Sequence, residues 1–302
     1  MLTAVPTAVL TAPSPYCPKE GIGTMAQTVS SPPRLRERDQ GPAHRPGRGP
    51  TDWLGGWRTM FVACGLLLAS FLALRVYQQF YAWYNEAGLN AASPDFKKYW
   101  FSLFVILVLL AGAISVAWWG WLVITGRKLI DKPVSRNEEV RRIAVFWGLV
   151  AATSLTLYFM ASFFPNQDGV WHQTLVRDTA LTPSHIVMFF WAFPLGITMT
   201  VGTYLYGRYR LPAVYGPEKG FPWSFFFLIA ASITEMMQVA MNEWGHSLWI
   251  TEEIFAAPFH WPFVTYGWLA SGIFALWAET AGRLLQLEEQ EAEKATVEAS
   301  AA

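Results

Sequence analysis

The stretch YWFSLFVILVLLAGAISVAWWGWLVIT, residues 99–125, decides the fold because it runs for 27 residues without one charged side chain. A helix that crosses the hydrocarbon core of a bilayer needs about 20 such residues. The chain contains five further apolar runs. The six runs cover residues 59–80, 99–125, 143–164, 183–207, 221–241 and 259–278. The sequence therefore predicts an all-α integral membrane protein, a bundle of about six transmembrane helices.

The composition of the whole chain agrees with a membrane protein. Hydrophobic residues make up 53% of the 302 residues and charged residues only 15%, whereas soluble domains contain about 25% charged residues. The formal net charge is zero, so no basic excess indicates a nucleic-acid partner. Cys17 lies in a polar segment and Cys64 in an apolar run, a spacing that excludes a zinc motif built from cysteines.

Three regions follow from the way composition changes along the chain. Residues 1–56 are rich in proline and arginine, which is typical of a disordered tail. Residues 57–285 contain all six apolar runs and form the predicted transmembrane domain. Residues 286–302 are polar and acidic, and we expect them to form a C-terminal tail.

The lysines and arginines of the connecting segments predict the orientation, because cytoplasmic loops carry an excess of them. Seven precede the first run, six follow the second and three follow the fourth. The segments after the first, third and fifth runs carry two, one and none. Both termini are therefore expected in the cytoplasm, and the segments after the third and fifth runs are expected at the outer face.

Four of the five histidines lie in those two outer segments or at the start of the apolar run that follows each of them. Asp168 and His172 are four residues apart, so on a helix their side chains share one face. Thr182 and Pro183 are typical of a helix start, with threonine as N-cap and proline at the first helical position. His185 then falls in the first turn of the fourth span. One carboxylate and two imidazoles form a sufficient ligand set for zinc, copper or non-haem iron.

The segment after the fifth run repeats this arrangement with an amide in place of the carboxylate. Asn242 and His246 are four residues apart, and His260 stands at the start of the sixth span. The two histidines of this pair are 14 residues apart and those of the first pair 13. Because an amide oxygen is a weaker ligand than a carboxylate, we expect this second metal site to bind less tightly.

Glu235 is a further candidate because it lies inside the fifth apolar run. A carboxylate at membrane depth is a functional candidate by default, and a catalytic role and a paired structural role both remain open. Two classes of protein other than an enzyme also remain open. One is a transporter whose histidines move a metal ion or protons, and the other is a structural subunit that binds metal.

Two motifs resemble one known family. DGVWHQTLVRDT at 168–179, followed by TPSHI at 182–186, and NEWGH at 242–246 are similar to the C subunit of the copper membrane monooxygenases. That family comprises particulate methane monooxygenase, ammonia monooxygenase and the short-chain hydrocarbon monooxygenases. The resemblance implies a metal site at Asp168, His172 and His185. It also implies a neighbouring copper site at Asn242, His246 and His260.

The same resemblance implies the activity and the partners. It predicts a copper enzyme that uses O2 to hydroxylate a small substrate in the bacterial inner or intracytoplasmic membrane. The A and B subunits of the family are the expected partners, in a trimer of ABC protomers, with quinol as a candidate reductant. The proline- and arginine-rich tail departs from the better-known members of the family, and the segment ITEMMQVAM around Glu235 is unlike the more apolar segment of the methane enzymes. These departures favour a short-chain hydrocarbon as substrate over methane or ammonia.

Overall fold

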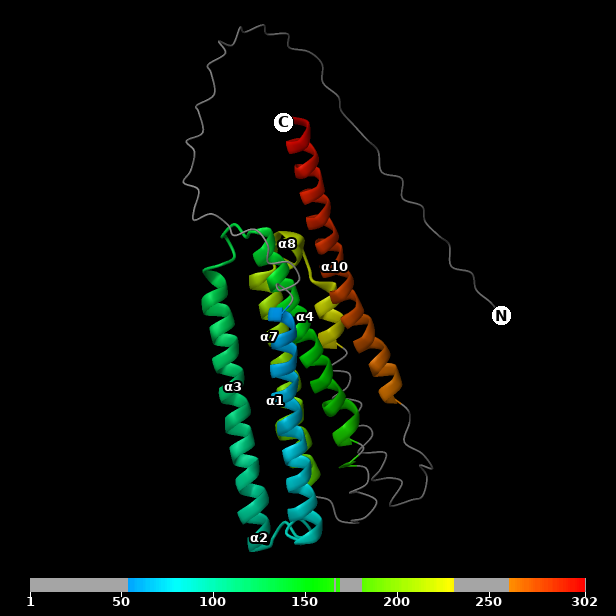
Figure 1. Cartoon of the computed structure of the whole chain (residues 1–302). Helices are drawn as coiled ribbons and strands as arrows, with labels where there is room; N and C mark the ends of the chain where they lie inside the picture. The colour runs from blue at the N-terminus through cyan, green and yellow to red at the C-terminus, as the bar shows by residue number, and fades with distance from the viewer. Residues whose placement is uncertain (1–53, 166, 169–180, 231–260, 302) are drawn as a thin grey trace, which may run out of the picture. The chain divides into compact units, whose positions relative to one another are not determined.

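Long helices form the part of the chain that the structure describes. The computed structural model describes residues 54–165, 167–168, 181–230 and 261–301, which all belong to one compact unit, residues 47–302. No strand occurs among these residues, which confirms the all-α prediction. The helices with their bounds are α1 Leu54–Gln78, α2 Pro94–Phe96, α3 Ser102–Arg127, α4 Arg136–Tyr158, α6 Pro183–Val187, α7 Phe193–Arg210, α8 Pro212–Tyr215 and α10 Trp261–Ala301 (Figure 1).

Short π-helical segments extend or join these helices. They are η2 Gln79–Tyr84, η3 Lys97–Phe101, η4 Phe159–Phe163 and η5 Met188–Ala192, and a 3-10 turn, η6, covers Pro217–Lys219. Together, the α- and π-helical segments form four continuous helices within the described residues that are long and apolar enough to cross a membrane. These are Gly56–Ala82, Pro94–Arg127, Arg136–Phe163 and Pro183–Arg210. They correspond to the first four predicted spans.

The remaining predicted regions are only partly described. Residues 223–230 are helical and begin the predicted fifth span, whose remainder lies outside the described residues. The predicted sixth span, 259–278, falls within α10 except for its first two residues, which also lie outside. Of the predicted tail 1–56 only residues 54–56 are described, and they begin α1. The predicted C-terminal tail, 286–302, is helical as far as Ala301 because α10 continues through it.

Small polar residues cap the starts of three helices, and the one at Thr182 was predicted from the sequence. The hydroxyl of Ser93 accepts a hydrogen bond from the backbone N–H of Phe96 at the start of α2. Ser135 accepts one from Glu138 N at the start of α4. The Thr182 hydroxyl accepts from His185 N at 3.2 Å, and Pro183 occupies the first position of α6. These caps satisfy N–H groups that have no partner within the helix.

Helices α1 and α4 run parallel and touch along their length. Phe71 stacks on Phe159 with ring centroids 4.5 Å apart. Nearer the helix starts, a Cβ on Gly148 would lie 2.7 Å from Gly56 O, so only glycine lets the two backbones approach this closely. Small residues at such contacts are a general means of packing transmembrane helices.

Hydroxyl groups connect α7 to its neighbours inside the bundle. Thr203 lies 2.9 Å from Thr153 of α4, oxygen to oxygen, and the two helices run antiparallel. Thr198 lies 2.6 Å from Ser115 of α3, which runs parallel to α7. In the most apolar windows of the third and fourth spans, 61% and 72% of residues are buried, against 11% and 17% in the first and second. Helices α4 and α7 therefore form the interior, and α1 and α3 present broad apolar faces outward.

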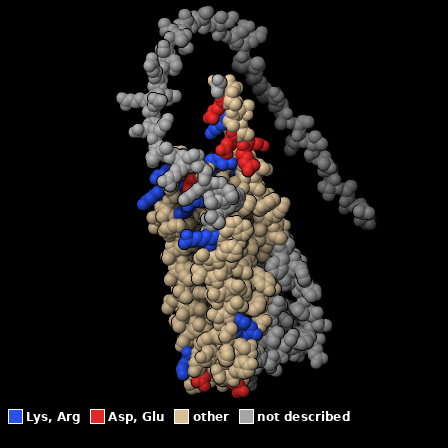
Figure 2. Space-filling view, viewed as in Figure 1, with Lys and Arg blue, Asp and Glu red and all other residues tan. Residues whose placement is uncertain are grey.

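Charged side chains gather at the two ends of the bundle (Figure 2). We call these the α2 end and the α8 end, after the short helices labelled there in Figure 1. At the α8 end, Arg283 of α10 binds the buried carboxylate of Glu139 through Nε–Oε1 and Nη2–Oε2 contacts of 2.7 and 3.1 Å. These hydrogen bonds raise the pKa of the Arg283 guanidinium. The arginine therefore remains charged, and the ion pair fixes α10 to α4.

Candidate metal site

Two of the six predicted metal ligands come together at the α2 end. Asp168 follows the helical segment α4–η4, and His185 stands in the first turn of α6. His185 Nε2 lies 3.3 Å from Asp168 Oδ2. The residues are 17 positions apart in sequence, so the fold, not local helix geometry, creates this pair.

The pair lies inside the protein, away from solvent. The side chain of Asp168 is fully buried and that of His185 is 10% exposed. Phe189, one turn further along the helix, packs against the imidazole with ring centroids 5.3 Å apart. Burying a carboxylate is costly unless other groups bind it. The buried Asp168 carboxylate therefore requires hydrogen-bond donors or a cation beside it.

Ser184 and Thr182 hold the pair in place. The Ser184 hydroxyl donates a hydrogen bond to Asp168 Oδ1, while Oδ2 faces His185. The Thr182 hydroxyl lies 3.2 Å from that of Ser184 and caps the helix that carries His185. Hydrogen-bonding groups of this kind orient metal ligands in proteins.

The connection between the first two spans covers this helix start. A Cβ on Gly88 would lie 2.7 Å from Cγ of Pro183, so the chain passes directly over the first residue of α6. Gly88 and Pro183 are themselves buried. The end of α6 nearest to His185 is therefore enclosed by chain from a different part of the sequence.

The separation of the two ligand atoms fits a shared metal ion. Metal–nitrogen and metal–oxygen bonds of about 2.1 Å at a tetrahedral angle place the two donor atoms about 3.4 Å apart. The observed distance of 3.3 Å lies close to this value. Asp168 and His185 can thus bind one ion with little rearrangement, and they supply two of the three ligands that such a site needs.

The other predicted site residues cannot be compared with the structure. His172, Asn242, His246 and His260, together with Glu235, lie outside the described residues. Within the described ranges, no three His, Cys, Asp or Glu side chains gather as a metal-binding group. Of the predicted ligands Asp168, His172 and His185, the structure therefore describes Asp168 and His185. That His172 is the third ligand stays a prediction.

Ser184 is a candidate site residue that the sequence pattern did not single out. Its position in TPSH, directly before a predicted ligand and in the first turn of a helix, was the available signal. A hydroxyl there is as easily explained by helix capping. Only the packing of Asp168 against α6 distinguishes the two roles.

A comparison with models of known families finds a match to this chain. The model that describes the C subunit of ammonia monooxygenase and methane monooxygenase matches residues 43–291, which is most of the chain and includes every predicted site residue. A search of curated proteins found no match.

Proposed function

The chain belongs to the family formed by the C subunits of the ammonia and methane monooxygenases, and from this premise we propose that it binds copper and takes part in the O2-dependent hydroxylation of a small substrate. Membership makes it a membrane subunit of a monooxygenase. The metal, the substrate and the partners are our inference. The observation that carries the proposal is the buried Asp168–His185 pair, whose donor atoms are 3.3 Å apart.

We assign the principal metal to Asp168, His172 and His185. Two imidazoles and a carboxylate are ligands that copper, zinc and iron all accept, and the family favours copper. Copper, when bound, supplies the one-electron redox chemistry that activation of O2 requires. In this assignment Ser184 fixes the rotation of the Asp168 carboxylate, and the surrounding helices exclude bulk water.

A second and weaker copper site is proposed at Asn242, His246 and His260. The nearly equal spacing of the two histidine pairs in the sequence supports it. Glu235, seven residues before Asn242, would lie on nearly the same helical face, and we propose it as a candidate for proton transfer or for pairing.

The proposed substrate is a short-chain hydrocarbon, with methane and ammonia as alternatives. Support comes from the proline- and arginine-rich segment before α1 and from the polar residues around Glu235. The proposed assembly is a trimer of protomers that also contain the A and B subunits of the family, and quinol is the proposed reductant. The outward apolar faces of α1 and α3 agree with a chain that has partners and lipid around it.

We further propose that the α8 end faces the cytoplasm of a bacterial inner or intracytoplasmic membrane. Basic residues near that end are Arg58, Arg127, Lys128, Lys132, Arg136, Arg141, Arg142, Arg208, Arg210, Lys219 and Arg283. Toward the α2 end the described basic residues are Arg75, Lys97 and Lys98. The positive-inside rule then places the metal site near the outer boundary of the membrane.

The test uses the complete complex in membranes, with His185→Ala compared with His44→Ala. His185→Ala removes a metal ligand, so we expect loss of copper and of substrate oxidation together while the complex keeps its size. His44 lies in the N-terminal segment, far in sequence from the predicted ligands, and its variant should match the parent. Copper per complex and turnover on ammonia, methane and propane are the measurements. Full turnover by a copper-depleted His185 variant would assign the site a structural role instead.

A further inference from the structure

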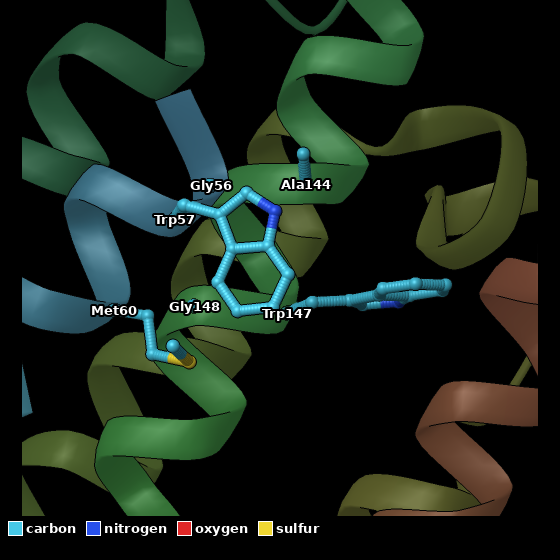
Figure 3. A pocket seen from close by; sticks show the side chains of 6 residues that line it. All are labelled: Gly56, Trp57, Met60, Ala144, Trp147 and Gly148. Atoms are coloured by element: carbon cyan, nitrogen blue, oxygen red, sulfur yellow. The ribbon is translucent and has the colours of Figure 1, made fainter. Parts of the chain in front are cut away.

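A small apolar pocket lies between α1 and α4, near the α8 end and far from the metal ligands. Its volume is about 200 Å³, and its lining residues are Gly56, Trp57, Met60, Ala144, Trp147 and Gly148 (Figure 3). Sites for drug-sized ligands occupy roughly 300–1,000 Å³. The pocket therefore suits a narrow apolar group, and a whole helix of about 10 Å diameter would not enter it.

Small residues form the base of this pocket and large ones form its sides. A Cβ on Gly56 would collide with the backbone of Ala144, and one on Gly148 would lie 2.7 Å from Gly56 O. Next to this close contact, the indoles of Trp57 and Trp147 project from the two helices (Figure 3). Trp147 Nε1 donates a 2.7 Å hydrogen bond to Thr280 Oγ1 of α10, which fixes that ring in position.

Trp57 gives the pocket a polar edge on the side of the α8 end. Its side chain is 55% exposed, and among the described residues its indole N–H has no hydrogen-bond acceptor. Figure 3 shows the nitrogen on the side of the ring nearer Ala144, with the six-membered ring toward Gly148. Ala144 precedes Gly148 in α4 and is therefore closer to the α8 end. The polar atom thus faces the membrane boundary and the apolar ring faces the membrane interior.

Arg58, the residue after Trp57 in α1, adds a positive charge at the same end of that helix. Its side chain is exposed and has no acidic partner among the described residues. Arg141 and Arg142 at the same end are instead bound to Glu138 at 2.7 and 2.8 Å. Of these three arginines, Arg58 is therefore the one whose charge remains available to an anion among the described residues.

We propose that this pocket binds one acyl chain of an anionic phospholipid from the leaflet at the α8 end, with the phosphate at Trp57 Nε1 and Arg58. The apolar lining matches hydrocarbon, and the N–H donor and the cation match the phosphate. Tryptophan at the boundary between hydrocarbon and headgroups is in its preferred environment. Basic side chains at that depth attract anionic lipids. The site is independent of the metal ligands and of the proposed oxidation.

The experiment uses the intact complex in phosphatidylcholine vesicles that contain a phosphatidylglycerol with a diazirine on one acyl chain. After illumination, mass spectrometry locates the adducts. We expect them on residues 57–60 and 144–148 of this chain. Trp57→Ala and Met60→Phe, which remove a wall and fill the pocket, should each abolish them. Trp223→Ala, at an exposed tryptophan outside the pocket, should leave them unchanged.

Arg58→Gln tests the charge. It should lower labelling by the phosphatidylglycerol probe about fivefold, the factor expected for one basic residue at an anionic surface. It should lower labelling by a phosphatidylcholine probe by a smaller factor, because the choline cation offsets the charge of the shared phosphate. Equal labelling of all exposed positions of α1 and α3 would overturn the proposal, as would labelling of a partner protein in place of the pocket. Competition by soluble glycerol phosphate would also overturn it, since that would indicate a phosphate site without an acyl chain.

Discussion

Ser184 is the residue whose role follows most directly from its contacts. Its hydroxyl donates to one oxygen of Asp168 while the other oxygen faces His185. Removing the donor frees the carboxylate to rotate, and loss of such an orienting group costs about 10–100-fold in metal affinity. We therefore expect Ser184→Ala to weaken copper binding by that factor in a complex of normal size.

Titration of the purified complex with a copper chelator measures this effect. Ser184→Thr keeps the hydroxyl and is expected to retain most of the affinity, because only a methyl group is added. Unchanged affinity in the alanine variant would mean that Ser184 acts only in the first turn of α6 and does not orient Asp168.

At the scale of the elements, the contact between α1 and α4 depends on glycine. A Cβ on Gly148 would lie 2.7 Å from Gly56 O and 3.0 Å from Met60 N, so Gly148→Ala must push the helices apart. Overpacking of this kind costs about 1–3 kcal/mol, and the thermal stability of the complex should fall. Gly65→Ala on α1 is the matched control, since nothing lies within 4 Å of its added Cβ. A similar melting temperature for both variants would refute the close-packing account.

The membrane-spanning helices could be predicted from the sequence because a bilayer demands long apolar runs. The start of α6 could also be predicted, because a helix cap involves residues that are neighbours in the sequence. The 27 uncharged residues at 99–125 and the Thr182–Pro183 start of α6 depend on no distant contact. The helix pairing and the hydrogen bond from Ser184 to Asp168 depend on side chains far apart in sequence, and periodicity carries no information about them. The π-helical segments at Gln79–Tyr84 and Met188–Ala192 likewise have no distinct sequence signal.

At the scale of the whole molecule, the distribution of basic residues predicts the direction of insertion. The α8 end contains most described lysines and arginines (Figure 2), and α10 continues beyond it to Ala301. A reporter fused after Ala302 should therefore be active only if it functions in the cytoplasm. A reporter that requires export should be inactive there. Activity of that reporter would show that the topology is inverted and that the metal site lies at the cytoplasmic face.

The proposed function depends on a copper ion shared by Asp168 and His185 in the assembled complex. The most direct measurement is an anomalous difference map of the purified complex, recorded on both sides of the copper absorption edge. We predict a peak within about 2.2 Å of both His185 Nε2 and Asp168 Oδ2, with the third ligand from His172. A map with copper in the partner proteins but no peak between these two atoms would contradict the account and reduce the pair to a structural contact.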